Sequence, residues 1–292
     1  MIRLNSIPIL KVRTRKEYQP IVDTSKAEER GIQRCIEFQN RDKDRINILG
    51  FSGGKDSISS YLVLVRSGIP FIPVYSLTSV DPPELIYYIL RVFNPWAKSK
   101  GYPVVIFAKY NVWKSGPNKG NLKTMWSLLS NRAIPPSRLK RYCCDELKER
   151  TGQEGDTIFT GVRWEESKAR RERQVINFYK GKIMVRPIVD WSEVEVWSYI
   201  LENEIPYCEL YDKGFNRLGC IGCPLGSNQK KELALYPNFR KLYIRAFNNM
   251  VIYRNRKGLR MDGWKKGEDV IKWWIGDCEV QRKEIDGQCT MF

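Results

Sequence analysis

The sequence predicts an α/β protein in which a doubly wound parallel sheet is followed by a C-terminal helical appendage. Three observations support this prediction. A short apolar run at 46–51 leads into a glycine-rich turn at 52–57 and then into a helical pattern at 58–67. Further apolar runs of strand length alternate with helical patterns as far as residue 203. From about residue 226 the composition becomes helical, aromatic and basic, without strand signals.

The remaining elements follow from the same periodicities. Gly68 is the expected stop signal of the first sheet-covering helix. We expect further strands at 71–77, 103–108, 157–161 and 182–187, and helices at 26–40, 81–100, 122–130, 138–150 and 191–203. In such a sheet, ligands bind at the carboxyl ends of the strands. The sequence therefore divides into an N-terminal extension (1–45), a nucleotide-binding domain (46–225) and a C-terminal appendage (226–292).

Composition places the chain among ordinary globular proteins. Of its 292 residues, 42% are hydrophobic and 28% are charged. No apolar stretch approaches the roughly eighteen residues that a membrane span needs, and the N-terminus lacks a signal-peptide core. We therefore expect a cytoplasmic protein without a membrane partner.

Charge and the absence of histidine limit the chemistry. Lysine and arginine number 50 against 33 acidic residues, a net charge of +17. Such an excess favours a polyanionic partner such as a nucleic acid, although a basic surface also serves solubility alone. With no histidine, Ser-His-Asp and Cys-His machinery and His-ligated metal sites are excluded.

The turn at 52–57 is the strongest candidate for a binding site. Its residues are Ser52, Gly53, Gly54, Lys55, Asp56 and Ser57. The glycines allow backbone amides to approach a phosphate, and the following helix directs its N-terminal dipole at the anion. Lys55 adds a charge, the two serine hydroxyls can donate hydrogen bonds, and Asp56 suits a Mg²⁺ ion held on the phosphates. The alternative is a tight glycine turn without function.

This turn resembles the signature of the PP-loop ATP pyrophosphatases, in the adenine nucleotide alpha-hydrolase superfamily. The resemblance implies that an adenine nucleotide binds, and that ATP is cleaved to AMP and pyrophosphate while an acceptor is activated. The wider likeness, over about residues 45–225, is to the PAPS reductase (sulfonucleotide reductase-like) family of that superfamily. Further segments of the sequence support this resemblance.

The segment at 160–171 is similar to the arginine-rich substrate loop of that family. By this match its glycine, serine and arginines face the nucleotide or the acceptor: Gly161, Arg163, Ser167, Arg170 and Arg171. Together with Lys55 and Asp56, Arg163 is the expected catalytic residue, because it would neutralise phosphate charge. The alternative is a solvated charged helix face. Segments 186–191 and 194–200 also resemble the family, and their apolar spacing indicates core packing alone.

Four cysteines form the candidate metal site: Cys143, Cys144, Cys220 and Cys223. A Cys-x-x-Cys pair allows both sulfurs to reach one metal centre. The adjacent pair followed by Cys-x-x-Cys, in a Leu-Tyr-Asp-x-Gly context, resembles the ligands of the 4Fe–4S cluster of APS reductases. A structural zinc site is the alternative interpretation of the four cysteines, and inert buried thiols are the third.

We carry three functional hypotheses. The first is an ATP-activating sulfurtransferase-like enzyme, resembling family members that insert sulfur into tRNA or DNA and needing a sulfur or electron donor protein. Trp264, Trp273 and Trp274 could then stack on bases. The second is an APS or PAPS reductase, an oxidoreductase that forms sulfite. The third is a nucleotide-sensing or nucleic-acid-binding module without turnover.

The second hypothesis meets one departure from the family. Sulfite-forming members carry a nucleophilic cysteine near the C-terminus in a Glu-Cys-Gly-x-His context, which this chain lacks. Only Cys278 or Cys289 could replace it. The unmodified Ser-Gly-Gly-Lys-Asp-Ser turn is typical of members that bind ATP.

Overall fold

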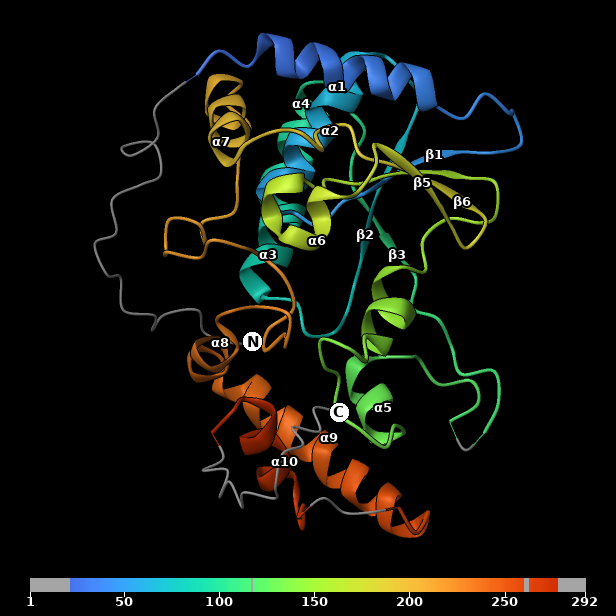
Figure 1. The fold of residues 1–292 in the computed structure, drawn as a ribbon, viewed down its shortest axis with the longest axis vertical. Coiled ribbons are helices and arrows are strands. Elements are labelled where there is room, and N and C mark those ends of the chain that lie inside the picture. Colours follow the sequence, from blue (N-terminus) through green and yellow to red (C-terminus); the bar gives the residue numbers. More distant parts are fainter. Residues whose placement is uncertain (1–21, 117, 260–262, 278–292) are drawn as a thin grey trace. The chain divides into compact units, whose positions relative to one another are not determined.

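The computed structural model describes residues 22–116, 118–259 and 263–277 (Figure 1). The chain forms two compact units. The first comprises Met1–Lys123 and Cys143–Cys220, and the second comprises Thr124–Tyr142 and Ile221–Phe292. The second unit thus takes in a segment from the middle of the chain besides the C-terminal region.

The first unit is built on a sheet that has six strands in the described part of the chain, ordered β3-β2-β1-β4-β6-β5. The strands are β1 (Asn47–Gly50), β2 (Ile72–Ser76), β3 (Ile106–Ala108), β4 (Thr157–Phe159), β5 (Ile176–Tyr179) and β6 (Lys182–Val185). All neighbours pair in parallel except β5, which is antiparallel to β6. The chain moves from β1 outward to β2 and β3, then returns to place β4 on the other side of β1. This reversal confirms the predicted doubly wound α/β fold and creates a switch point between β1 and β4.

The sequence analysis does not predict strand β5. Because β5 is antiparallel to β6, the sheet is mixed rather than wholly parallel. Its residues are half-buried or exposed, because the strand lies at the sheet's edge. An edge strand that follows an arginine-rich segment shows no continuous apolar run, which is the signal used to find the others.

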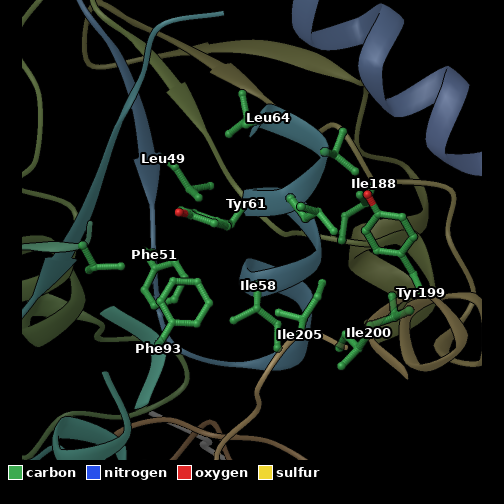
Figure 2. Packing of buried hydrophobic residues seen from close by; sticks show 14 of the residues in the cluster. Leu49, Phe51, Ile58, Tyr61, Leu64, Phe93, Ile188, Tyr199, Ile200 and Ile205 are labelled. Carbon is green, nitrogen blue, oxygen red and sulfur yellow. The ribbon is translucent and has the colours of Figure 1, made fainter. Parts of the chain in front are cut away.

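Helices α1 (Ser25–Phe38), α2 (Lys55–Ser67) and α7 (Glu193–Glu202) pack together beside the sheet (Figure 1). Most of α2 is buried, and its Tyr61 hydroxyl donates to the Pro103 carbonyl at 2.7 Å. Gly68 ends α2 in the left-handed conformation (φ 72°), as expected. Figure 2 shows Tyr61 and Leu64 of α2 within the core. Phe51 and Phe93 pack there with ring centroids 4.7 Å apart.

Three helix predictions differ from the structure in detail. Helix α2 begins at Lys55, so the last three residues of the glycine-rich turn form its first turn rather than preceding it. The predicted helix at 138–150 is reduced to a π-helical turn, Cys144–Lys148. The predicted helix at 81–100 is present as α3 (Pro83–Tyr88), a π-helical segment (Ile89–Phe93) and α4 (Asn94–Ser99).

The second unit is helical, with α5 (Met125–Ser130), α8 (Gln229–Leu235), α9 (Pro237–Arg256) and α10 (Gly267–Trp274). Its core is aromatic. Tyr243 of α9 packs against Trp126 of α5 and Trp274 of α10, with ring centroids 5.1 and 4.9 Å apart. Gly267 at the start of α10 permits α10 to approach α9 closely, because a Cβ there would lie 2.2 Å from the Ile244 carbonyl oxygen.

Two of the three tryptophans expected to stack on bases are core residues. Trp264 and Trp274 are only 6% and 8% exposed, and the Trp274 indole donates to the Pro136 carbonyl at 2.7 Å. The third, Trp273, is 47% exposed, and its ring lies edge-on to that of Trp264 with centroids 5.0 Å apart. None of the helices in the described ranges has the length and apolar character required to cross a bilayer.

Candidate nucleotide-binding site

The candidate phosphate loop connects β1 to α2 at the carboxyl edge of the sheet. Gly53 has φ 71°, and a Cβ on it would lie 2.6 Å from the Leu85 side chain. The backbone conformation therefore favours glycine, and a Cβ would in addition displace the Leu85 side chain. Because α2 starts at Lys55, the positive end of its dipole lies at the loop, which favours an anion there.

The serine hydroxyls hold the loop in shape. The Ser57 hydroxyl donates to the Gly54 carbonyl at 2.8 Å and accepts from the Ser52 amide at 3.2 Å. The Ser52 hydroxyl lies 3.1 Å from the Ser57 hydroxyl and accepts from the Gly54 amide at 3.4 Å. The sequence predicts that these hydroxyls donate hydrogen bonds to phosphate. In the structure the Ser57 proton is used within the loop, so we assign Ser57 to preorganisation of the loop.

Three predicted residues come together in one ion-pair group. The Asp56 carboxylate accepts from Arg163 Nε at 2.6 Å and lies 3.3 Å from Lys55 Nζ. Lys55 is only 6% exposed, whereas the Asp56 side chain is 22% exposed. One carboxylate thus holds two buried cations beside the loop.

The structure turns Arg163 inward. Its side chain is 2% exposed, and Nη1 donates to Glu165 Oε2 and to the Trp191 carbonyl, each at 2.9 Å. Burial alone would lower the pKa of this guanidinium, but the charge and hydrogen bond of Asp56 outweigh it and raise the pKa above its ordinary value. Arg163 is therefore permanently charged and engaged with protein groups on several sides.

The loop after β4 lies directly against the phosphate loop. A Cβ on Gly161 would be 2.6 Å from the Asp56 carbonyl oxygen, so only glycine allows the two loops to meet. Further along, the Arg163 amide donates to Glu166 at 2.9 Å, and Glu166 also forms an ion pair with Arg170. Ser167 and Arg171 are exposed, and neither lies in the ion-pair group around Asp56.

Tyr211 is a residue of the site that the sequence reading did not assign. The Lys55 backbone amide donates to its hydroxyl at 2.8 Å. Tyr211 is 2% exposed, and its ring packs edge-on against Trp197 with centroids 5.0 Å apart. The Leu-Tyr-Asp motif was visible in the sequence, but only the fold brings it to α2.

The predicted metal ligands fall into both units: Cys143, Cys144 and Cys220 in the first and Cys223 in the second. All six cysteines in the described part of the chain are thiols rather than disulfides. The Cys220 thiol donates to the Thr78 hydroxyl at 3.4 Å, in the loop that follows β2.

The other two described cysteines lie in the core. Burial raises the pKa of the Cys35 and Cys208 thiols, to about 12 for Cys208, which suits apolar packing. Cys143, Cys144 and Cys223 are half-buried, so their exposure suits ligation better. However, no group of three or more histidine, cysteine, aspartate or glutamate side chains is arranged to hold a metal ion within the described ranges. The cluster stays a prediction, and Cys278 and Cys289 lie outside the described residues.

Comparison with known sequences agrees with this fold. Residues 46–225 match the family described as "Phosphoadenosine phosphosulfate reductase domain". An uncharacterised protein of Methanocaldococcus jannaschii is 30% identical over 227 residues, which are 74% of this chain and 49% of that protein. The chain thus spans about half the length of this relative. The adenosine 5'-phosphosulfate reductase of Neisseria meningitidis is 39% identical over 90 residues, covering 29% of this chain and 37% of the reductase.

Solved structures give more distant similarities. A phosphoadenylyl-sulfate reductase from Candida auris has a TM-score of 0.46 at 16% identity, over 70% of this chain and 98% of that chain. A U34-tRNA thiolase from Methanococcus maripaludis, solved with its [4Fe-4S] cluster, has a TM-score of 0.40 at 13% identity, over 87% and 92% of the two chains.

Proposed function

Because the chain belongs to the phosphoadenosine phosphosulfate reductase domain family, we propose that it is an enzyme that binds ATP at Ser52–Ser57 and cleaves it to AMP and pyrophosphate. Cleavage would activate an acceptor for sulfur transfer. One observation favours this function over the alternative functions. The loop has the complete Ser-Gly-Gly-Lys-Asp-Ser sequence, and α2 begins inside it at Lys55, so the positive end of the helix dipole and a buried lysine lie at the same point.

The proposed reaction has two steps. An acceptor oxygen attacks the α-phosphorus of ATP, and the bond between the α-phosphorus and the bridging oxygen breaks, with pyrophosphate as the leaving group. A sulfur nucleophile then displaces AMP from the activated acceptor. The chain contributes position and charge: the Lys55 side chain and the N-terminal dipole of α2 attract the β- and γ-phosphates and stabilise the negative charge of the leaving group.

Arg163 and Asp56 take roles that differ from those expected. Both Asp56 oxygens are ion-paired, one with Arg163 and one with Lys55, so the carboxylate fits a residue that positions Lys55 better than a ligand of Mg²⁺. We assign no step to Mg²⁺. Arg163, turned inward, acts through Asp56 as a positioning residue.

The four cysteines remain the proposed ligands of a 4Fe–4S cluster, with zinc as the alternative. Support comes from their spacing and from the half-buried state of Cys143, Cys144 and Cys223. A bound cluster would supply iron-coordinated sulfur chemistry or electron transfer. Anaerobic purification followed by iron and zinc analysis tests the assignment. Cys223→Ser should lose the metal and Cys208→Ala should keep it; equal metal content in both variants would contradict it.

The alternative function, an adenosine 5'-phosphosulfate reductase, has one specific observation in its favour, the 39% identity over 90 residues to the Neisseria enzyme. Two reactions distinguish the proposals. One contains ATP, Mg²⁺ and bulk RNA or DNA and is assayed for pyrophosphate. The other contains adenosine 5'-phosphosulfate and reduced thioredoxin and is assayed for sulfite. Pyrophosphate release that falls about a hundredfold in Lys55→Met, but not in the exposed control Lys43→Ala, supports our proposal. Sulfite formation alone would replace it with the reductase.

A further inference from the structure

Three arginines lie together beyond the nucleotide site: Arg170, Arg173 and Arg186, hereafter the arginine cluster. Arg186 directly follows β6 and is 4% exposed. Its amide donates to the Val175 carbonyl at 2.9 Å, and Nη1 donates to the Gln174 carbonyl at 2.6 Å. The side chain is therefore fixed against the backbone that immediately follows Arg173. The Arg173 amide in turn donates to the Arg170 carbonyl at 3.0 Å.

The cluster is short of negative charge. Arg186 Nη2 donates to the Asn177 side-chain oxygen, but Nε is buried without a hydrogen-bond partner, and neither Arg186 nor Arg173 forms an ion pair with any residue that the structure describes. The carboxylate of Glu166 pairs with Arg170. Burial, and then the positive charges of Arg173 and Arg170, lower the pKa of Arg186. A buried guanidinium with like charges beside it is unfavourable unless an anion completes the site.

The cluster lies at the same edge of the sheet as the phosphate loop. β6 runs parallel to β4, and β4 to β1, so the residues that follow these strands share the carboxyl edge. Arg186 follows β6, two strands away from β1, which is roughly 10 Å at the usual spacing. Contacts also connect the two places: Asp56 to Arg163, the Arg163 amide to Glu166, and Glu166 to Arg170.

We propose that the arginine cluster is a second phosphate-binding site, which holds a backbone phosphodiester of a nucleic-acid acceptor while the nucleotide lies on Ser52–Ser57. Guanidinium groups match phosphate oxygens in pairs, and such contacts fix the register of a nucleic acid without reading its bases. The local charge fits a polyanion, since residues 168–182 contain six lysines and arginines against the single acidic residue Glu172. The identity of the occupant rests on the proposed function, whereas the anion site itself does not.

Arg173→Ala is the most informative variant, because Arg173 is exposed and its loss should leave the fold intact. The control is Arg41→Ala, an exposed arginine that precedes β1 at the opposite, amino edge of the sheet. Binding of a fluorescein-labelled single-stranded oligonucleotide is measured by anisotropy at several salt concentrations, and ATP binding is measured by calorimetry on the same proteins.

We expect Arg173→Ala to bind the oligonucleotide about tenfold more weakly, as loss of a charged hydrogen bond predicts. The slope of log affinity against log salt should fall by about 0.7, the loss of one phosphate contact. ATP affinity should be unchanged, and Arg41→Ala should match the unaltered protein. The proposal is overturned if the oligonucleotide does not bind the unaltered protein, or if both variants bind it equally. It is also overturned if ATP affinity falls as much as oligonucleotide affinity, because the site then holds the nucleotide's own phosphates. Absence of ATP cleavage alongside the expected binding result would refute the proposed function alone.

Discussion

Replacing Asp56 by asparagine tests whether the Arg163–Asp56 pair organises the site. The change removes the negative charge between two buried cations, Arg163 at 2% exposed and Lys55 at 8% by side chain. Removing one partner of a fully buried pair costs about 3–5 kcal/mol. Asp56 is 22% exposed, and Arg163 keeps its bonds to Glu165 and the Trp191 carbonyl, so we expect about 2 kcal/mol.

Urea denaturation followed by tryptophan fluorescence measures this loss as a change in the free energy of unfolding. The matched control is Glu209→Gln, which removes one charge from an exposed ion pair. The side chain of Glu209 is 62% exposed and that of its partner Lys213 is 36% exposed. Such pairs contribute less than about 0.5 kcal/mol. If Asp56→Asn costs no more than the control, the pair does not organise the site, and Arg163 must be assigned to direct nucleotide contact instead.

Three other perturbations follow from the geometry. Gly161→Ala should destabilise the first unit by about 1–3 kcal/mol, because its Cβ would lie 2.6 Å from the Asp56 carbonyl oxygen; an unchanged denaturation midpoint would contradict the close approach of the two loops. Tyr211→Phe leaves the buried Lys55 amide without its acceptor, so it should cost about 1–3 kcal/mol of stability and weaken ATP binding about fivefold; unchanged affinity in calorimetry would mean that the hydroxyl does not shape the loop. The Cys208 thiol, with its pKa raised by burial from 9.0 to about 12, stays protonated in the folded protein when the unfolded chain has ionised. Its contribution to stability is therefore complete below pH 9 and is lost as the pH rises from 9 towards 12, and Cys208→Ala should flatten this part of the curve of stability against pH. An identical curve for this variant would show that another group is responsible.

The sheet and the turn at Ser52–Ser57 could be predicted from the sequence because their signals are local. The apolar run at 46–51 and the glycines after it predict β1, the turn and α2, and the structure confirms them. The exact start of α2 could not be predicted, because Lys55–Ser57 has the composition of either a loop or a first helical turn.

The arrangement of the site depends on contacts between distant segments, which no local pattern reveals. Arginine-rich loops commonly face a ligand, yet Arg163 turns inward because the backbone carbonyl of Trp191 and the Asp56 carboxylate meet it there. Tyr211 reaches Lys55 across more than 150 positions of sequence, so its role could not be read from its neighbours. Burial of Trp264 and Trp274 likewise follows from the packing of α9 and α10.

The products formed from ATP test the central claim most directly. Purified protein is incubated with ATP labelled in the adenine ring and in the γ-phosphate, in the presence of RNA or DNA, and the labelled products are separated. Our account predicts pyrophosphate and an equal amount of AMP, released or still bonded to the nucleic acid, and about a hundredfold less of both in Lys55→Met. Formation of ADP and inorganic phosphate, or sulfite from adenosine 5'-phosphosulfate without any cleavage of ATP, would contradict it.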